Sequence, residues 1–175
     1  MSETFDFEDG NGPVPAHRHK NPDGSIGGWV ANTAKVAETA WVGSNALVFG
    51  KAQVADKAGV SGQARVFENA SVFGKARVSG DAKMYGQACV FDDARVFDKA
   101  RVFGHAKVSG DAKVCGEAQV CGKAWVYGNA SVVGYAHVSG KDQVFGNAVV
   151  SSQNLRAELE KVHAQHVQGK RVVGW

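Results

Sequence analysis

The stretch KVSGDAKVCGEAQVCGKAWVYGNASVVGYAHVSG, residues 107–140, places valine at every sixth position and alanine two residues before it. Counted in sixes from Val30 to Val150, 20 of 21 positions are valine, and the exception is Met84. Two residues earlier, 19 of 20 positions are alanine, and the exception is Asp142. Glycine follows two residues after the valine position in 13 of the 21 words. The chain therefore repeats the word A-x-V-x-G-x without an insertion or a deletion.

This six-residue period fits a strand and a corner better than it fits a helix. In a helix, six residues at about 100° each turn the chain by roughly 240°, so the valines would define no apolar stripe. In a strand, alanine and valine two residues apart point to one side, and the residues that flank valine point to the other. Glycine supplies the backbone angles of a sharp corner. Each word therefore predicts one short strand and one corner, and successive words coil so that strands stack about 4.8 Å apart.

The opening words of the repeat, GSIGGWVANTAKVAETAWVG (24–43) and NALVFGKAQV (45–54), resemble a known family. Words such as GKARVSGDAK (74–83) are similar to the hexapeptide repeats of the bacterial transferase superfamily. The opening words are similar, more narrowly, to polymer-forming or transferase-like hexapeptide proteins of bacteria, phages and prophages. The resemblance implies an all-β, left-handed parallel β-helix with three words per coil, a winding opposite to the usual right-handed rule for parallel strands. It also implies a homotrimer. We therefore expect about seven triangular coils.

Composition divides the chain into three segments. Residues 1–27 hold all three prolines and the turn NPDG, and we expect an irregular N-terminal lead-in. Residues 28–153 carry the hexapeptide repeat. Residues 154–175 begin with the helix-forming run NLRAELEKVHAQHVQGK, with Asn154 as the expected N-cap and Gly169 as the expected stop. Because a solenoid must cover its open ends, we expect both termini to act as caps.

Charge and cysteine content bear on the expected partners and on the cellular compartment. The formal net charge is +3, which does not by itself call for a nucleic-acid partner. The acidic start MSETFDFEDG resembles neither a signal peptide nor a membrane span, so we expect no membrane partner and a place in the cytoplasm of a bacterial host or in a virion. Cys89, Cys115 and Cys121 flank core valines and face outward, and we expect them reduced and unbonded. No cofactor is expected.

Residues 18 apart should stack in columns on the outside, because three words make one coil. On two of the three faces the residue after the core position is often aromatic, and such rings are too apolar to stay in water without a partner. We expect these two faces to meet two neighbours in the homotrimer. The expected contact residues are Phe49, Phe67, Tyr85 and Phe103 on the first face, and Phe73, Phe91, Tyr127 and Phe145 on the second.

Basic residues allow a second interpretation of the surface. Arg65, Lys83 and Arg101 alternate with the rings of the first face, an arrangement that can hold nucleic acid or nucleotides by stacking and charge. We favour the subunit contact over nucleic acid, because arginine also lies against rings in protein interfaces. The third face combines small residues with a basic column that can hold anions, although aspartates at the preceding corners are expected to offset its charge. The column is Arg77, Arg95 and Lys113, and the aspartates are Asp92, Asp93 and Asp111.

Candidate catalytic residues are few. The hexapeptide acyltransferases that the chain resembles use a histidine base near a subunit interface, often with loops inserted between words. This repeat has no inserted loop, and its histidines are His105, at a corner, and His137, which faces outward. The zinc carbonic anhydrases of the same fold need three converging histidines, whereas these two are 32 residues apart. The other histidines lie outside the repeat: His17, His19, His163 and His166.

These observations favour a non-enzymatic, rigid homotrimer that serves as a structural or binding module, associated with a phage or prophage. One alternative is an acyl-CoA-dependent acyltransferase, with His105 or His137 as base and its site between subunits. Another is the capture of a small anionic ligand or a nucleotide in the clefts between subunits, without turnover. A separate protein partner is also compatible with the apolar faces.

Overall fold

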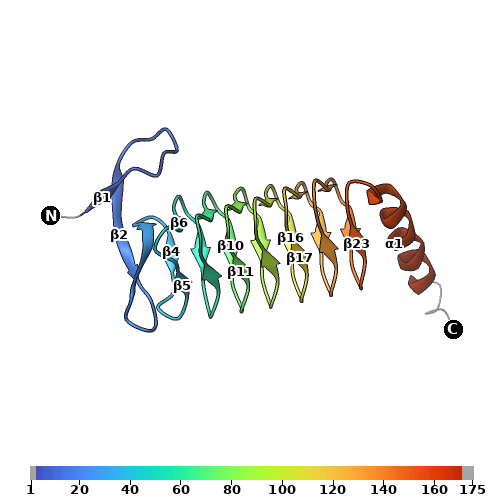
Figure 1. Cartoon of the computed structure of the whole chain (residues 1–175), viewed down its shortest axis with the longest axis horizontal. Coiled ribbons are helices and arrows are strands. Elements are labelled where there is room, and N and C mark those ends of the chain that lie inside the picture. The colour runs from blue at the N-terminus through green and yellow to red at the C-terminus, as the bar shows by residue number, and fades with distance from the viewer. Residues whose placement is uncertain (1–2, 171–175) are drawn as a thin grey trace.

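The computed structural model describes residues 3–170, without the side chains of residues 162, 163 and 165–170. Within this part, the chain forms 23 strands and one helix (Figure 1). The strands coil into a long prism of about seven turns, with a hairpin at the N-terminal end and the helix at the other end. The expected all-β parallel β-helix with a C-terminal helix is confirmed.

Each coil contributes one strand to each of three parallel sheets, which are the three faces expected from the sequence. The first face contains β3 (Ile26–Ala31), β6 (Leu47–Val48), β9 (Arg65–Val66), β12 (Lys83–Met84), β15 (Arg101–Val102), β18 (Gln119–Val120) and β21 (His137–Val138). The second face contains β4 (Lys35–Val36), β7 (Gln53–Val54), β10 (Ser71–Val72), β13 (Cys89–Val90), β16 (Lys107–Val108), β19 (Trp125–Val126) and β22 (Gln143–Val144). The third face contains β5 (Trp41–Val42), β8 (Gly59–Val60), β11 (Arg77–Val78), β14 (Arg95–Val96), β17 (Lys113–Val114), β20 (Ser131–Val132) and β23 (Val149–Val150).

The alanine and valine positions build the core. Nearly all of them are no more than 1% exposed, and so is Met84, which takes the place of a valine. Strand pairing sets residues 18 apart side by side, as Val72 pairs with Val90. Valine suits this interior because its branched side chain is stiff and packs well on a pleated surface. The register that buries the valines also fixes the columns on the outside.

The corners depend on one residue in the left-handed backbone region. The 13 corner glycines from Gly50 to Gly146 have φ between 64° and 74°. Four other corners use acidic residues, with φ between 57° and 60°. Each of these carboxylates accepts a hydrogen bond, 2.8–3.1 Å long, from the amide of a glycine in the next coil. The bond offsets the cost of a left-handed residue with a Cβ atom, and the acidic residues are Asp56, Glu68, Asp92 and Asp98.

The lead-in, expected to be irregular, contains strands instead. β1 (Thr4–Phe5) pairs antiparallel with β2 (Val14–Lys20), and β2 pairs antiparallel with β3. These additions extend the sheet of the first face to nine strands. Side chains of β2 alternate in burial from Val14 to Arg18, which is the pattern of a strand, and an irregularity in the pairing between Arg18 and Lys20 then lets His19 point inward as well. Pro15 is the second residue of β2, and its carbonyl still accepts a hydrogen bond of 2.9 Å from the amide of Asn32.

Two polar side chains of this hairpin cover the open edge of the first coil. Asn21 Oδ1 accepts a hydrogen bond of 2.9 Å from the amide of Val42, and His19 Nε2 lies 3.0 Å from the carbonyl oxygen of Ala40. Both side chains are buried, His19 at 6% and Asn21 at 4% exposure. Because no earlier coil exists to pair these backbone groups, the hairpin supplies their partners.

Helix α1 (Leu155–Lys170) covers the last coil. Leu155 and Leu159 pack against the core, as expected for a C-terminal cap. The helix continues through Gly169, which was the expected stop, because one glycine costs a helix only about 1 kcal/mol. Within residues 3–170, no helix has the length and apolar character that a membrane crossing needs.

Asn154 precedes the helix, as expected of an N-cap, but its side chain faces the solenoid. Its Oδ1 accepts a hydrogen bond of 2.6 Å from the amide of Ser151, and its Nδ2 donates one of 2.9 Å to the carbonyl of Val149. The side chain therefore fastens the start of the helix to the last coil.

Candidate functional site

A continuous column of stacked rings runs along the first face. The ring centroids of Phe49 and Phe67, of Phe67 and Tyr85, and of Tyr85 and Phe103 lie 4.9, 5.1 and 4.9 Å apart. These distances match the spacing of neighbouring strands, so each ring lies on the ring of the preceding coil. Phe67, Tyr85 and Phe103 are only partly buried in the single chain, and burial raises the pKa of the Tyr85 hydroxyl. The column predicted from the 18-residue spacing is present.

The N-terminal segment occupies one end of this column. Phe7 stacks on Phe49 with centroids 4.8 Å apart, and Phe49 is only 4% exposed. Phe49 therefore offers little surface to a second subunit, although it was expected to make such a contact. The part of the column that remains open to a partner is Phe67, Tyr85 and Phe103.

The second face carries a shorter, interrupted set of rings. Phe73 stacks on Phe91 at 5.1 Å, and Tyr127 stacks on Phe145 at 5.2 Å. Between the two pairs stands Ser109, which is buried and accepts a hydrogen bond of 3.2 Å from the indole N–H of Trp125. Trp125 also contacts Tyr127, with ring centroids 4.6 Å apart. Its side chain therefore fills the gap, and aromatic surface extends over most of this face.

The basic residues of the first face have different surroundings. Arg65 lies over the Phe49 ring at 5.5 Å and donates a hydrogen bond to the Phe7 carbonyl. Lys83 and Arg101 follow it in register, with Lys83 half-buried and Arg101 exposed. Arg65 therefore holds the N-terminal segment against the column, while the other two cations face outward.

The basic column of the third face is also in register, because Arg77 pairs with Arg95 and Arg95 with Lys113. The expected offset by aspartates does not take the form of ion pairs, since none joins this column to a carboxylate within the described residues. Asp92 instead accepts a hydrogen bond from a backbone amide of the next coil, because it stabilises a left-handed corner. The cations of this column are therefore free of direct ion pairs within the described residues, although the aspartates at the preceding corners remain nearby.

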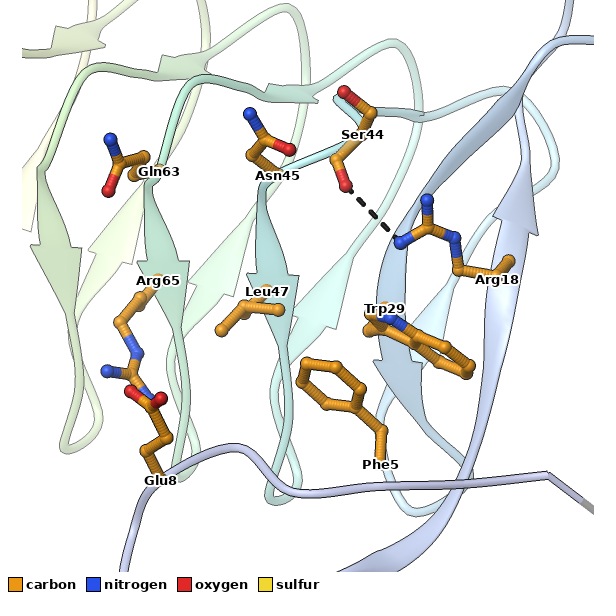
Figure 2. Close-up of a pocket in the computed structure, with 9 residues that line it drawn as sticks. All are labelled: Phe5, Glu8, Arg18, Trp29, Ser44, Asn45, Leu47, Gln63 and Arg65. Carbon is orange, nitrogen blue, oxygen red and sulfur yellow. Dashed lines mark hydrogen bonds between the residues drawn. The ribbon is translucent and has the colours of Figure 1, made fainter.

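A hollow of about 420 Å³ lies where the N-terminal segment meets the first coils (Figure 2). Arg18 lies over the Trp29 ring at 5.3 Å and donates a hydrogen bond of 3.4 Å to the Ser44 carbonyl. Phe5 stacks on Trp29 with centroids 4.7 Å apart. The residues that line the hollow are Phe5, Glu8, Arg18, Trp29, Ser44, Asn45, Leu47, Gln63 and Arg65.

The polar groups of this hollow mostly hold parts of the chain together. The guanidinium of Arg18 joins β2 to a corner of the solenoid, and that of Arg65 joins β9 to the N-terminal segment. Only the Nε atom of Arg65 is buried without a hydrogen-bond partner among the described residues. The arrangement therefore acts as a joint between the hairpin and the first coils.

The two histidines of the repeat lie two coils apart. His105 is exposed at a corner, whereas the Nε2 atom of His137 lies 3.2 Å from the Sγ atom of Cys121. Burial raises the pKa of the Cys121 thiol, which favours a neutral thiol beside the imidazole. In the part of the chain that the structure describes, the cysteines are unbonded, and no three His, Cys, Asp or Glu side chains are placed to hold a metal ion. The side chains of His163 and His166 lie outside that part.

Comparison with protein-family models, with curated proteins and with solved structures found no significant match. The resemblance to the hexapeptide superfamily therefore rests on the repeat itself, and function has to be argued from the geometry of the surface.

Sequence reasoning missed the joint formed by Phe5, Phe7, Arg18 and Trp29. The signal for it was weak: only Val14 and Ala16 alternate with their neighbours in this run, and the phenylalanines of the acidic start were the other hint. It also missed the contact between Cys121 and His137, which are 16 residues apart. That separation is close to one coil, so the two side chains come from neighbouring coils and adjacent columns.

Proposed function

We propose that this protein is a rigid, non-enzymatic structural or binding module that assembles as a homotrimer through its first and second faces. The observation that carries the proposal is the open column Phe67, Tyr85 and Phe103, a flat aromatic surface three coils long. A second copy of the chain suits it as partner, because the second face offers aromatic surface with the same repeat. Rings in both copies then recur at the spacing of the strands, about 4.8 Å.

Two adjacent apolar faces on one prism favour a closed ring. If the first face of each chain contacts the second face of the next chain, three copies of a triangular prism can close about a threefold axis. Burial of a half-exposed phenylalanine contributes on the order of 1 kcal/mol, so several rings at each contact support a stable assembly. The third face then remains in solvent; most of its outward residues are small or basic, and Trp41 and Phe97 are its aromatic exceptions.

Rigidity follows from the bonding between coils. Backbone amides before and after each core position donate to carbonyls of the next coil, as Arg77 does to Ala94 and Ser79 to Val96, both at 2.9 Å. Corner carboxylates add further bonds between coils. Such a body keeps its surface columns in fixed order, which suits a scaffold in a bacterial cytoplasm or a virion.

The assembly is tested by comparing Phe103→Ser with Phe97→Ser. Phe103 belongs to the open column, whereas Phe97 occupies the same repeat position on the third face and is also partly exposed. We expect multi-angle light scattering to give a trimer mass for the wild type and Phe97→Ser, and a shift toward monomer for Phe103→Ser. Circular dichroism checks that both variants remain folded. Equal masses for the two variants at every concentration would contradict the proposal.

A second candidate, acyl transfer from acyl-CoA, is supported by the contact between Cys121 and His137. The imidazole can take the thiol proton while the sulfur attacks the thioester carbonyl, and then pass that proton to the departing CoA thiolate. The raised pKa of Cys121 opposes this step, because less thiolate is present at neutral pH. Incubation with acetyl-CoA followed by mass spectrometry tests it. An acetyl group on Cys121 that disappears in His137→Ala would favour the enzyme over the module.

A further inference from the structure

The third face contains a notch where one repeat word lacks a side chain. Among the 21 residues that directly precede the valine position, Gly59 is the only glycine. It lies in β8, paired with Trp41 of β5 on one side and with Arg77 of β11 on the other. The missing side chain leaves a hollow of about 460 Å³, lined by Trp41, Lys57, Gly59, Ser61, Arg77 and Ser79.

Neither the backbone nor the packing requires glycine at this position. The φ angle of Gly59 is not in the left-handed region, and a Cβ atom built there would meet one atom within 4 Å, the Cβ of Trp41 at 4.0 Å. By contrast, a Cβ atom on Gly43 would lie 3.1 Å from the Cα of Ser61. A glycine inside a strand weakens the strand and often marks a bulge, a bend, or the close approach of a ligand or another backbone. Gly59 is paired in regular register on both sides, and in the described part of the chain no backbone atom, apart from those of its own neighbours, lies close to the position of a Cβ atom there. The open notch at Gly59 therefore points to an occupant from outside the chain.

We propose that the notch binds a free nucleoside phosphate, with its base held between the side chains of Trp41 and Arg77. These two residues are separated by two strand spacings, about 9.6 Å, which leaves room for one flat ring at the level of Gly59. An indole and a guanidinium both present flat faces, which suit a planar heteroaromatic ring better than a puckered sugar. Trp41 is 40% exposed and therefore accessible to a ligand.

The base would take the place of the missing side chain in the column. The same molecule already stacks rings at this period, as Tyr85 does on Phe103 at 4.9 Å. A ring seated over Gly59 would continue the spacing from Trp41 to Arg77 without moving the backbone. The notch can therefore accept a single planar ring between Trp41 and Arg77 without a rearrangement of the backbone.

Cations around the notch supply the charge that a phosphate needs. Lys57 lies at the corner that leads into β8, and Arg77 opens the column that continues with Arg95 and Lys113. None of these four side chains forms an ion pair with a carboxylate in residues 3–161. Like charges on neighbouring strands repel one another. A phosphate bound at the start of the column relieves that repulsion.

The carboxylates at the corners before this face keep their negative charge, but they are hydrogen-bonded to backbone amides and form no ion pair with the cations of the notch within the described residues. The carboxylate of Asp56 accepts a hydrogen bond from the backbone amide of Gly74, and that of Asp92 accepts one from Gly110. The hydroxyl groups of Ser61 and Ser79 line the same hollow and can donate hydrogen bonds to ligand oxygens. The site lies on the face that the proposed trimer leaves in solvent, so binding and assembly can be tested separately.

The test is isothermal titration calorimetry with AMP on the full chain, with Gly59→Gln as the variant that fills the notch. Ser131→Gln is the matched control, because Ser131 occupies the same column four coils away, in β20. We expect AMP to bind the wild type and Ser131→Gln within twofold of each other, and Gly59→Gln at least tenfold more weakly. The melting temperature of Gly59→Gln should equal or exceed that of the wild type, because glycine is not required there. Arg77→Gln should reproduce the loss, while Lys113→Gln should cause a smaller one.

Two smaller ligands measure the contributions of the base and of the phosphate separately. Adenosine alone and inorganic phosphate alone should each bind at least tenfold more weakly than AMP, because each satisfies only half of the site. Equal binding of AMP by the wild type and Gly59→Gln would overturn the proposal, and so would the absence of binding by AMP, GMP and UMP alike. Much tighter binding of a short oligo(dA) than of AMP would also overturn it, since the base would then come from single-stranded nucleic acid.

Discussion

At the scale of single residues, the acidic corners show how a side chain can replace the glycine that a left-handed turn favours. A residue with a Cβ atom in this region costs about 1–2 kcal/mol. Asp92 meets that cost with a hydrogen bond of 3.1 Å from the amide of Gly110, in the next coil. The repeat predicts the corners where glycine stands. It does not predict the acidic ones from local propensity, because their compensating bond is made to a residue 18 positions away.

Two substitutions of Asp92 distinguish the contribution of its hydrogen bond with Gly110 from the energetic cost of its left-handed backbone. We expect Asp92→Ala to lower the free energy of unfolding by about 1–2 kcal/mol, because the bond is lost and the left-handed backbone remains. Asp92→Gly loses the same bond but relieves the backbone, so its free energy of unfolding should stay within about 0.5 kcal/mol of the wild type. Unfolding in guanidinium chloride measures both. An equal decrease in the free energy of unfolding for the two variants would show that the left-handed backbone at this corner costs nothing for a residue with a Cβ atom.

The cysteines provide a second test at this scale. Burial raises the pKa of the thiols of Cys89, Cys115 and Cys121 above the ordinary value. A raised pKa means less thiolate at pH 8, so iodoacetamide should label the folded protein more slowly than the chain unfolded in guanidinium chloride. The rate for the folded protein should keep rising at pH values where the unfolded chain has levelled off. Mass spectrometry of the labelled peptides follows each site, and equal rates in both states would contradict the burial of these thiols.

At the scale of elements, the two ends of the prism are covered by different means. The helix covers the last coil with Leu155 and Leu159, and a C-terminal helical cap was predicted from the sequence. The hairpin covers the first coil with Asn21, which accepts a hydrogen bond from the amide of Val42, and with His19, whose ring contacts the carbonyl of Ala40. The N-terminal segment also adds Phe7 to the aromatic column. Local sequence could not predict the contact of Phe7 with Phe49, because it depends on where the hairpin folds back over the first face.

The hairpin cap is tested by Asn21→Leu. This substitution leaves the amide of Val42 buried without a partner, so we expect a loss of about 1–3 kcal/mol that is confined to the first coils. Hydrogen–deuterium exchange should become faster in residues 26–48 and stay unchanged in residues 100–140. The control is Asn32→Leu, because Asn32 contacts His17 at an exposed position and should have little effect. Uniformly faster exchange along the chain would contradict the prediction that Asn21 stabilises only the first coils.

At the scale of the whole molecule, the 18-residue register connects the core to the surface. The same pairing that buries valine places Phe67, Tyr85 and Phe103 in one column, and it places Arg77, Arg95 and Lys113 in another. These columns could be predicted from the sequence because the repeat has no insertion. The interruption at Ser109 and its filling by Trp125 could not, because that contact joins two different columns.

The central claim is that these columns bring copies of the chain together, and sedimentation equilibrium of the wild-type protein tests it most directly. The account predicts a single species of three times the chain mass at micromolar concentration, with dissociation only on strong dilution. A mass equal to one chain over the whole concentration range would contradict it, because the aromatic rings of two faces would then remain in water.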